Sequence, residues 1–375
     1  MFRRIRPILT KEFRQIRRDK RSLGVLLVLP AFLIFLIGYA LNFDVKHAPL
    51  AVFDQDKKQA SRELIQAFIN NEYFSYRHTV GQDREIATLL GEGKALIAIV
   101  IPPGFSRELL AGRDASVQVL VDGSNANTAT AVLGYTSAVL QSFSSKLTMR
   151  TMQRVGRELY LPLDFRPKVW YNPELVSAKF LVPGLIGFIL MISGVVSTSL
   201  SVVKENERGT MEQIMVSPLS TRQVIIGKTI PYLIIGLLGS VLVLLVGFFL
   251  FDIVIRGNLF WLYVGIGLFL LAALGQGVLI STIAQTQQVA FILSVFSSLL
   301  PTFLLSGFVF PIRSMPIILQ ILSNVAPAKF FLIVVRSVIL KGAGPGAFWD
   351  QLVFLAIFAL LTLGISILRL RKRIE

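Results

Sequence analysis

The sequence predicts an α-helical membrane protein with six transmembrane helices and an extracytoplasmic α/β domain inserted between the first and second spans. Three observations support this fold class. Apolar residues make up 54% of the chain and its mean hydropathy is +0.67, outside the usual range of soluble proteins. Six long runs carry almost no charge. The polar segment 44–179, between the first two runs, is long enough to form its own core.

Each apolar run can cross a bilayer, because about 20 helical residues span a hydrocarbon core of roughly 30 Å. We expect the six spans at residues 22–43, 180–203, 229–251, 257–284, 289–311 and 351–368. Between the last two, residues 311–345 combine several prolines with an apolar helical pattern. This pattern predicts a re-entrant region on the outer side of the membrane.

The basic residues predict the orientation of the spans. Residues 1–21 contain nine Lys and Arg, and residues 369–373 contain four more. Because basic residues collect on the cytoplasmic side of membrane proteins, we expect both termini and the loop 204–228 in the cytoplasm. The net charge of +16 therefore largely reflects basic residues that set the orientation of the spans in the membrane. Nucleic-acid binding is disfavoured, because these basic residues do not alternate with stacking aromatics.

Residues 1–21 also have the pattern of an amphipathic helix. The apolar residues that recur at helical spacing among the arginines are Ile5, Ile8, Leu9, Phe13 and Ile16. We expect a cytoplasmic basic helix that lies along the membrane, with its cations facing anionic headgroups. A cleaved signal peptide is the alternative, since residues 38–40 resemble a cleavage site. The apolar stretch exceeds the about 7–15 residues of a signal core, so we expect the first span to be retained.

The polar segment 44–179 alternates between strand and helix patterns. Strands are expected at residues 49–53, 74–80, 95–101 and 117–121, and helices at residues 57–70, 83–92, 104–111 and from 125 to about 157. This alternation predicts a compact α/β domain. It follows a span that starts in the cytoplasm, so we expect it outside the cytoplasm. Asp122, Ser124, Asn125 and Asn127 could hold a metal or a sugar, but helix capping is the favoured explanation.

Polar residues are sparse inside the expected spans. The most polar positions are Ser193, Ser197, Ser201, Gln276, Ser294, Ser297 and Ser298. We interpret them as helix-packing residues or as the lining of a translocation path, because small residues let helices approach closely. No charged residue lies deep in a span, which disfavours an ion-coupled carrier. The lack of a charged ring or filter-like segment disfavours an ion channel.

The loop 204–228 combines acidic residues with a short apolar stripe between two spans. Such a polar helix cannot enter hydrocarbon, so it docks on the membrane surface or on a soluble partner. A solvated connector is the alternative. Residues 227–229 superficially resemble the end of a phosphate-binding loop, but Arg222 replaces the required earlier glycine and no strand precedes it. The chain has no cysteine and no catalytic motif, so we expect no enzyme activity, metal or bound cofactor.

Several segments resemble permeases of the type-2 family of ATP-binding-cassette (ABC) exporters. In the loop these are ERGTMEQ at residues 207–213, VSPL at residues 216–219 and GK at residues 227–228. KEFRQIRRD at residues 11–19 resembles the start of these permeases. LIAIVIPPGFS at 96–106, VLVDGSNANTA at 119–129 and WYNP at 170–173 resemble the bacterial subgroup with a large periplasmic domain.

This resemblance implies the membrane subunit of an ATP-driven exporter in the bacterial inner membrane, with hydrophobic, drug-like cargo. It implies that the loop couples the permease to its ATPase through Glu205, Glu207, Arg208, Gly209, Thr210, Met211, Glu212 and Met215. ATP and Mg are expected on two copies of a separate nucleotide-binding ATPase subunit. A second permease chain, identical or related, is expected to form the other wall of the path. The periplasmic domain is expected to contact an adaptor and an outer-membrane channel.

A mechanotransmission or assembly protein is the main alternative function. Such a protein would use cytoplasmic ATP to move its outer domain without passing cargo through the membrane. A continuous, partly polar path between the second and fifth spans would favour export. A dry, fully packed seam between two permease chains would favour the alternative.

Overall fold

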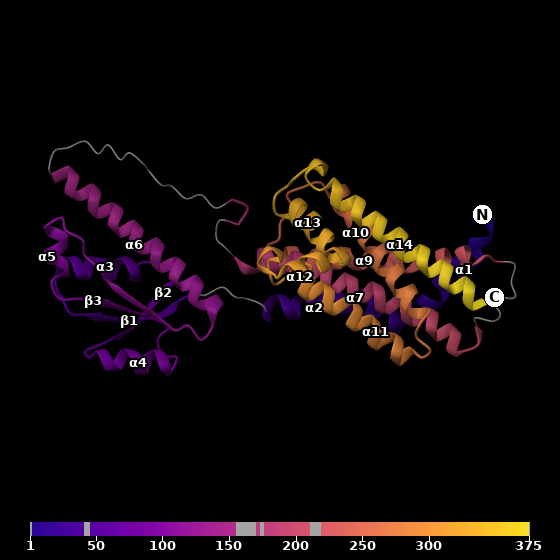
Figure 1. Cartoon of the computed structure of the whole chain (residues 1–375), viewed down its shortest axis with the longest axis horizontal. Helices are drawn as coiled ribbons and strands as arrows, with labels where there is room; N and C mark the ends of the chain where they lie inside the picture. The colour runs from indigo at the N-terminus through magenta and orange to yellow at the C-terminus, as the bar shows by residue number, and fades with distance from the viewer. Residues whose placement is uncertain (1, 41–45, 155–169, 173–175, 211–218, 375) are drawn as a thin grey trace. The chain divides into compact units, whose positions relative to one another are not determined.

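A computed structural model of the chain describes residues 2–40, 46–154, 170–172, 176–210 and 219–374. The chain forms two compact units (Figure 1). Met1–Asn42 and Lys168–Glu375 make up a helical unit, and Phe43–Pro167 make up a unit that contains a β-sheet.

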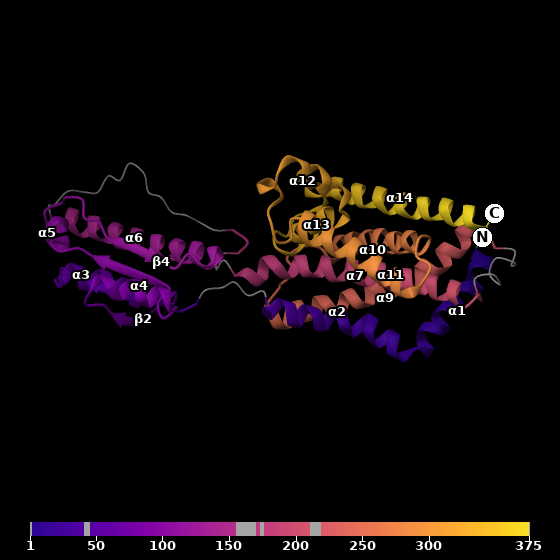
Figure 2. The ribbon, with the colours of Figure 1, turned by 60° about the horizontal axis from the view of Figure 1, so that its bottom comes forward.

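The helical unit is organised around α7 (Ser177–Glu207). Its neighbours are α2, α9, α10, α11 and α13, which surround α7 in both ribbon views (Figures 1 and 2). The other helices of this unit are α1 (Phe2–Arg18), α2 (Lys20–Ala40), α9 (Thr221–Phe251), α10 (Leu259–Ser281), α11 (Gln287–Leu300), α12 (Ile317–Leu322), α13 (Pro327–Ile339) and α14 (Trp349–Ile374). Both termini lie at the same end of this unit, beside α1 (Figures 1 and 2).

Glycines let the central helices approach closely. A Cβ atom at Gly184 of α7 would lie 2.1 Å from the Phe308 ring, and one at Gly277 of α10 would lie 2.5 Å from the Val195 carbonyl oxygen. Such small-residue contacts are typical of helix packing in membranes, where van der Waals contact replaces the hydrophobic effect. The core of this unit is accordingly held by close packing around α7.

Five helices of the described chain are long and apolar enough to cross a membrane. They are α7, α9, α10, α14 and α11, the last continued through the π-helical turn η1 (Pro301–Leu305). The pair Ile317–Val325 and Pro327–Ile339 is bent by 84° and would make a sixth if counted as one span. In α2, the described apolar stretch Leu26–Ala40 is shorter than these.

Two helices extend beyond the predicted spans into the loop 204–228. Helix α7 continues to Glu207, and α9 begins at Thr221. The Ser220 hydroxyl accepts a hydrogen bond from the Gln223 amide (3.4 Å), and the Gln223 side chain accepts one from the Ser220 amide (3.1 Å). This reciprocal capping box starts α9 eight residues before its apolar run. Hydropathy alone does not detect such polar helix ends, which need not enter hydrocarbon.

The second unit contains a four-stranded sheet in the order β2-β1-β3-β4. Strand β1 (Ala48–Asp54) pairs in parallel with β2 (Phe74–Thr79) and β3 (Ile97–Ile101), and β4 (Gln118–Val121) is antiparallel to β3. Its helices are α3 (Gln59–Ile69), α4 (Asp83–Gly91), α5 (Phe105–Leu110) and α6 (Ala126–Arg154). The strand ends lie within two residues of the predicted ones.

Alternate residues of the strands form two cores, one on each face of the sheet. Leu50 and Ile97 pack with Phe68 of α3 in the first core, and Ala98 packs with Ile86 of α4 in the second. Figure 1 shows α3 and α4 on opposite faces of the sheet. All five residues of β3 are buried, as expected for a central strand covered on both sides.

Candidate functional site

The predicted coupling residues lie at the end of α7 that faces the two termini. Residues 205–210 are described, whereas Met211, Glu212 and Met215 fall outside the described residues. Glu205 and Glu207 end α7, and Arg208 follows as its C-cap. Gly209 takes the left-handed φ of 69° that a non-glycine residue rarely adopts. The Thr210 hydroxyl then donates a hydrogen bond to the Glu205 carbonyl oxygen (3.2 Å), which closes the turn.

Glu205 is buried in a network of four charged side chains. Its carboxylate lies 2.5 Å from the Lys11 ammonium through one oxygen and 2.5 Å from the Lys228 ammonium through the other. Lys228 in turn donates to Glu12 at 3.1 Å. Glu12, Glu205 and Lys228 are only 1%, 4% and 2% exposed. The network therefore joins three elements, α1, α7 and α9, at one end of the helical unit.

The amphipathic pattern of α1 explains why Glu12 is buried. Ile5, Ile8, Glu12 and Ile16 form one buried stripe, so the carboxylate occupies a position that the pattern reserves for apolar residues. Ile8 packs against Gly227, where an added Cβ would lie 2.8 Å from the isoleucine side chain. This close approach brings Glu12 to Lys228. The apolar stripe of α1 thus faces α9.

The charges of this network compensate one another. Burying an unpaired carboxylate or ammonium is expensive, and removing one partner of a buried pair typically costs about 3–5 kcal/mol. Two lysines and two glutamates satisfy each other here, although Lys11 remains 45% exposed. The network is therefore stable only while α1, α7 and α9 keep their relative positions.

Glu207 connects the end of α7 to another helix. Its carboxylate accepts a hydrogen bond from the Gln287 backbone amide (2.7 Å) and a second from the Gln287 side chain. Gln287 is the first residue of α11, where unpaired amides and the helix dipole favour a negative charge. Two glutamates two positions apart thus tie the end of α7 to different neighbours, Glu205 to α1 and α9, and Glu207 to α11.

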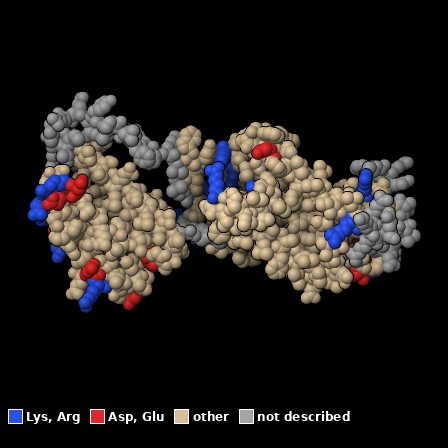
Figure 3. All heavy atoms as spheres, in the orientation of Figure 1, with Lys and Arg blue, Asp and Glu red and all other residues tan. Residues whose placement is uncertain are grey.

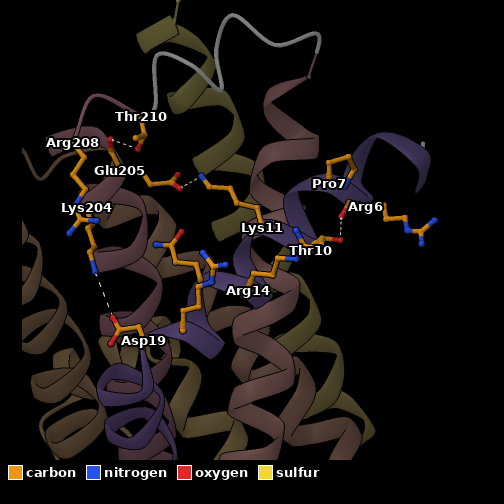
Figure 4. Close-up of a pocket in the computed structure, with 12 residues that line it drawn as sticks. Arg6, Pro7, Thr10, Lys11, Arg14, Asp19, Lys204, Glu205, Arg208 and Thr210 are labelled. Atoms are coloured by element: carbon orange, nitrogen blue, oxygen red, sulfur yellow. Dashed lines mark hydrogen bonds and ion pairs between the residues drawn. The ribbon is translucent and has the colours of Figure 1, made fainter.

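A cleft of about 1070 Å³ opens beside the network, between α1 and the end of α7 (Figure 4). Its lining residues are Arg6, Pro7, Thr10, Lys11, Arg14, Gln15, Arg18, Asp19, Lys204, Glu205, Arg208 and Thr210. Lys204 lies 3.9 Å from Asp19 across the cleft. The cleft is strongly basic, with six Lys and Arg against two acidic residues.

The serines of the predicted second span, in α7, face the interior of the helical unit. Ser193 and Ser197 line a narrow crevice shared with α2, α9 and α10. The Ser197 hydroxyl donates to the Ser193 carbonyl oxygen (2.5 Å), and Ser201 hydrogen-bonds Tyr232 of α9. The structure thus places this stripe toward the first and third predicted spans, away from the fifth.

The polar residues of the predicted fourth and fifth spans, in α10 and α11, meet each other. The Gln276 side chain donates to the Ser297 carbonyl oxygen and hydroxyl, each at 3.2 Å, and so joins α10 to α11. Ser294 and Ser298 are buried, and the Ser298 hydroxyl donates to the Ser294 carbonyl oxygen (2.6 Å). The two predicted serine groups are therefore not brought together within one chain.

Sequence reasoning missed Lys11, Glu12 and Lys228 as one group, and it also missed Arg336. The Arg336 guanidinium in α13 donates to the carbonyl oxygens of Gly307 (3.0 Å) and Phe308 (3.4 Å). It also lies 3.9 Å from the centre of the Phe180 ring. A lone arginine in the apolar run 330–340 was the available signal. Among the described residues, no group of three or more His, Asp or Glu could hold a metal ion.

Comparison with known proteins identifies the family. A family profile described as "ABC-2 family transporter protein" matches residues 20–368. The chain is 32% identical to "Probable multidrug ABC transporter permease YbhS" of Escherichia coli K12, over all of this chain and 98% of that protein. It is 33% identical to "Probable multidrug ABC transporter permease YbhR" of the same organism, over 94% of each chain.

A third relative is similar over a comparable length. "Inner membrane transport permease YhhJ" of Escherichia coli K12 is 28% identical over 97% of this chain and 96% of its own length. The resemblance predicted from the loop 204–228 is therefore confirmed. Together with its apolar helices, these matches show that the chain belongs to the ABC-2 transporter family and is a membrane-spanning permease subunit of an exporter.

Proposed function

We propose that this permease moves a hydrophobic, drug-like substrate out of the cytoplasm or the inner membrane, driven by a separate ATPase. The multidrug permease names of the two relatives that match over nearly their whole length support this cargo class. The family match favours export over mechanotransmission. In this proposal the chain has no ATPase site of its own, and ATP and Mg bind to two copies of a nucleotide-binding subunit.

The proposed topology has six spans, with both termini in the cytoplasm. The six are α2, α7, α9, α10, α11 continued through η1, and α14, while α12 and α13 form an outer re-entrant region at residues 311–345. Both termini lie at one end of the helical unit, which supports an even number of crossings (Figures 1 and 2). Figure 3 supports the crossing direction of the helices, because charged side chains on this face lie at the two ends of the helical unit with an uncharged band between them.

In this topology residues 1–21 form the cytoplasmic helix, residues 22–43 the first span and residues 44–179 the periplasmic domain. The chain lacks cysteine, so single-cysteine labelling tests the proposal directly. Gln82 of the sheet unit and Asn206 at the end of α7 are both exposed. A membrane-impermeant maleimide applied to spheroplasts is expected to label the Gln82→Cys variant and to spare Asn206→Cys. The reverse pattern would overturn the orientation.

The buried charge network is the observation that carries the coupling proposal. The turn at residues 208–210, in which Arg208 and Gly209 are exposed, follows the end of α7 at Glu207. Thr210 bonds back to the Glu205 carbonyl oxygen, so a displacement of this turn by the ATPase would act on α7. Glu205 passes the displacement to α1 and α9 through Lys11 and Lys228, and Glu207 passes it to α11 through Gln287. Helices α7 and α11 are the second and fifth spans, which we propose to line the path together with a second permease chain.

Coupling through the loop is tested by reversing its charge. Replacing both Glu207 and Glu212 with Lys removes the link from Glu207 to α11 and reverses the charge at both positions, so ATP hydrolysis is expected to continue without transport of a hydrophobic dye. The variant should insert normally, since Glu207 is exposed. Unchanged transport per ATP by a well-inserted double variant would contradict the coupling role of this loop.

The partners are tested by gentle purification from native membranes with mass spectrometry of the bound proteins. We expect a stoichiometric subunit that carries a nucleotide-binding cassette, and a second permease that is either a copy of this chain or a relative. A periplasmic adaptor and an outer-membrane channel are expected in weaker association. Recovery of the intact chain without any ATPase subunit would contradict the proposal that it belongs to an ATP-driven pump.

A further inference from the structure

The basic cleft between α1 and the end of α7 holds more positive charge than its own acids can neutralise. Six cationic side chains and two acidic ones line it. The two acids are already engaged, Asp19 near Lys204 and Glu205 with Lys11 and Lys228. Within the described chain, four cleft arginines have no carboxylate partner: Arg6, Arg14, Arg18 and Arg208. The cleft therefore retains several guanidinium groups for an external anion.

The chemistry of these side chains indicates which anion would fit. Guanidinium groups match the oxygens of phosphate with paired, charge-assisted hydrogen bonds. Arg14 extends from α1 and Arg208 from the end of α7, so guanidinium groups line both walls of the cleft (Figure 4). Arg18 of α1 also belongs to the lining. Thr10, Gln15 and Thr210 add neutral hydrogen-bonding groups to the same lining.

The position of the cleft next to α2 favours a lipid over a soluble phosphate. Helix α2 begins at Lys20, directly after the cleft residues Arg18 and Asp19. Its outward face exposes Val28, Leu29, Phe32, Phe35 and Leu36. In an integral membrane protein these side chains face acyl chains, and the polar layer above them is only about 5–8 Å thick. We propose that the cleft binds the phosphate headgroup of an anionic glycerophospholipid whose acyl chains lie along α2.

Lys11 would make this lipid a regulator of the charge network. Its ammonium lines the cleft, is 45% exposed, and is paired with buried Glu205. A phosphate in the cleft competes with Glu205 for Lys11 and so weakens one of the links between α1 and α7. This role rests on the proposed coupling function, but binding of the lipid does not require transport.

The direct test counts retained lipids by native mass spectrometry. The whole chain is reconstituted in nanodiscs of phosphatidylcholine with increasing phosphatidylglycerol. The cleft variant carries Arg14→Gln, Arg18→Gln and Arg208→Gln. The control variant carries Arg17→Gln, Arg222→Gln and Arg369→Gln, which remove the same charge from exposed arginines outside the lining. A cleft variant with Lys at the same three positions keeps the charge and tests the guanidinium.

We expect the wild type and the control to retain one phosphatidylglycerol per chain. The cleft variant should need roughly tenfold more phosphatidylglycerol for the same occupancy, because each basic residue near a membrane contributes measurably to anionic lipid binding. The Lys variant should recover part of the loss. The cleft glutamine variant, the cleft lysine variant and the control variant should have equal melting temperatures, which would show that their folding is intact.

Four results would overturn the proposal. The first is equal retention by cleft and control variants, and the second is equal retention of phosphatidylcholine. Displacement of the lipid by millimolar inorganic phosphate would assign the cleft to a soluble phosphate instead. A cleft variant that keeps its lipid but loses the ATPase subunit would assign the cleft to protein docking.

Discussion

The two units each contain a buried carboxylate, and these carboxylates are held in different ways. In the sheet unit, Asp56 accepts hydrogen bonds from the Gly104 amide (3.0 Å) and from the Ser106 amide (3.1 Å) and hydroxyl. In the helical unit, Glu205 is held by two lysine ammonium groups from α1 and α9. Backbone amides are fixed by the local fold, whereas lysine side chains are long and flexible.

This difference indicates different roles for the two sites. Asp56 fixes the start of α5 against the end of β1 through two backbone amides, which cannot change partners without breaking the local fold. Glu205 can exchange one ammonium partner when α1 or α9 moves. We therefore expect the Asp56 site to contribute only stability, and the Glu205 network to contribute both stability and coupling.

The largest effect is expected from Lys228→Met. It removes the ammonium that pairs with both Glu12 and Glu205. Glu205 keeps Lys11 as a partner, whereas Glu12, which is 1% exposed, is left as an uncompensated buried carboxylate. The free energy of unfolding should fall by about 3–5 kcal/mol, as measured by denaturation of the purified chain. The double variant Glu12→Gln with Lys228→Met should recover most of this loss. No recovery in the double variant would show that the lysine stabilises through packing.

A smaller effect is expected from Arg336→Gln at the other end of the helical unit. The shortened side chain cannot reach both the Gly307 and Phe308 carbonyl oxygens, so buried acceptors lose their donors. We expect a loss of about 1–3 kcal/mol with ATP-driven transport still coupled to hydrolysis. Uncoupling by this variant would extend the mechanical role to the opposite end of the helical unit, so that the Glu205 network would no longer be the only coupling element among the described residues.

Asp56 allows a pH test of the sheet unit. Hydrogen bonds, chiefly from the Ser106 hydroxyl, lower the pKa of Asp56 from its usual value. Its contribution to stability is therefore fully present above the unfolded-state pKa of about 3.9 and is lost as the pH falls through the lower folded-state pKa. We expect Asp56→Asn to reduce the melting temperature of this unit at pH 7 and to flatten its decline below about pH 4. If the melting temperature of Asp56→Asn depended on pH as that of the wild type does, Asp56 would not be the group that loses its stabilising effect in acid.

The smallest effect is expected from the partly exposed pair Lys204 and Asp19, which lie 3.9 Å apart. Replacing Lys204 with Met should change the free energy of unfolding by less than about 1 kcal/mol, because exposed ion pairs contribute little. Denaturation under the conditions used for Lys228→Met provides the comparison. If the Lys204 variant lost as much stability as Lys228→Met, burial would not explain the difference expected between the two ion pairs.

Local patterns predicted most of the elements but could not predict the charge network. The apolar run at residues 229–251 and the strand pattern at residues 95–101 are properties of short segments, and the structure places a helix and a strand there. The pairs Lys11–Glu205 and Glu12–Lys228 join residues 194 and 216 positions apart. No periodicity relates such distant residues. The one local clue was an acidic residue, Glu12, on the apolar stripe of α1.

The measurement that tests the coupling claim most directly uses the variant with Glu12→Gln, Glu205→Gln and Lys228→Met. It removes all buried charge of the network together, and such neutral replacements often leave stability unchanged or raised. Glu92→Gln with Lys94→Met, at an exposed pair in the sheet unit, serves as the control. Substrate transported per ATP hydrolysed is compared after reconstitution with the ATPase subunit. We predict a folded triple variant that hydrolyses ATP with little transport, and wild-type transport per ATP in that variant would contradict the account.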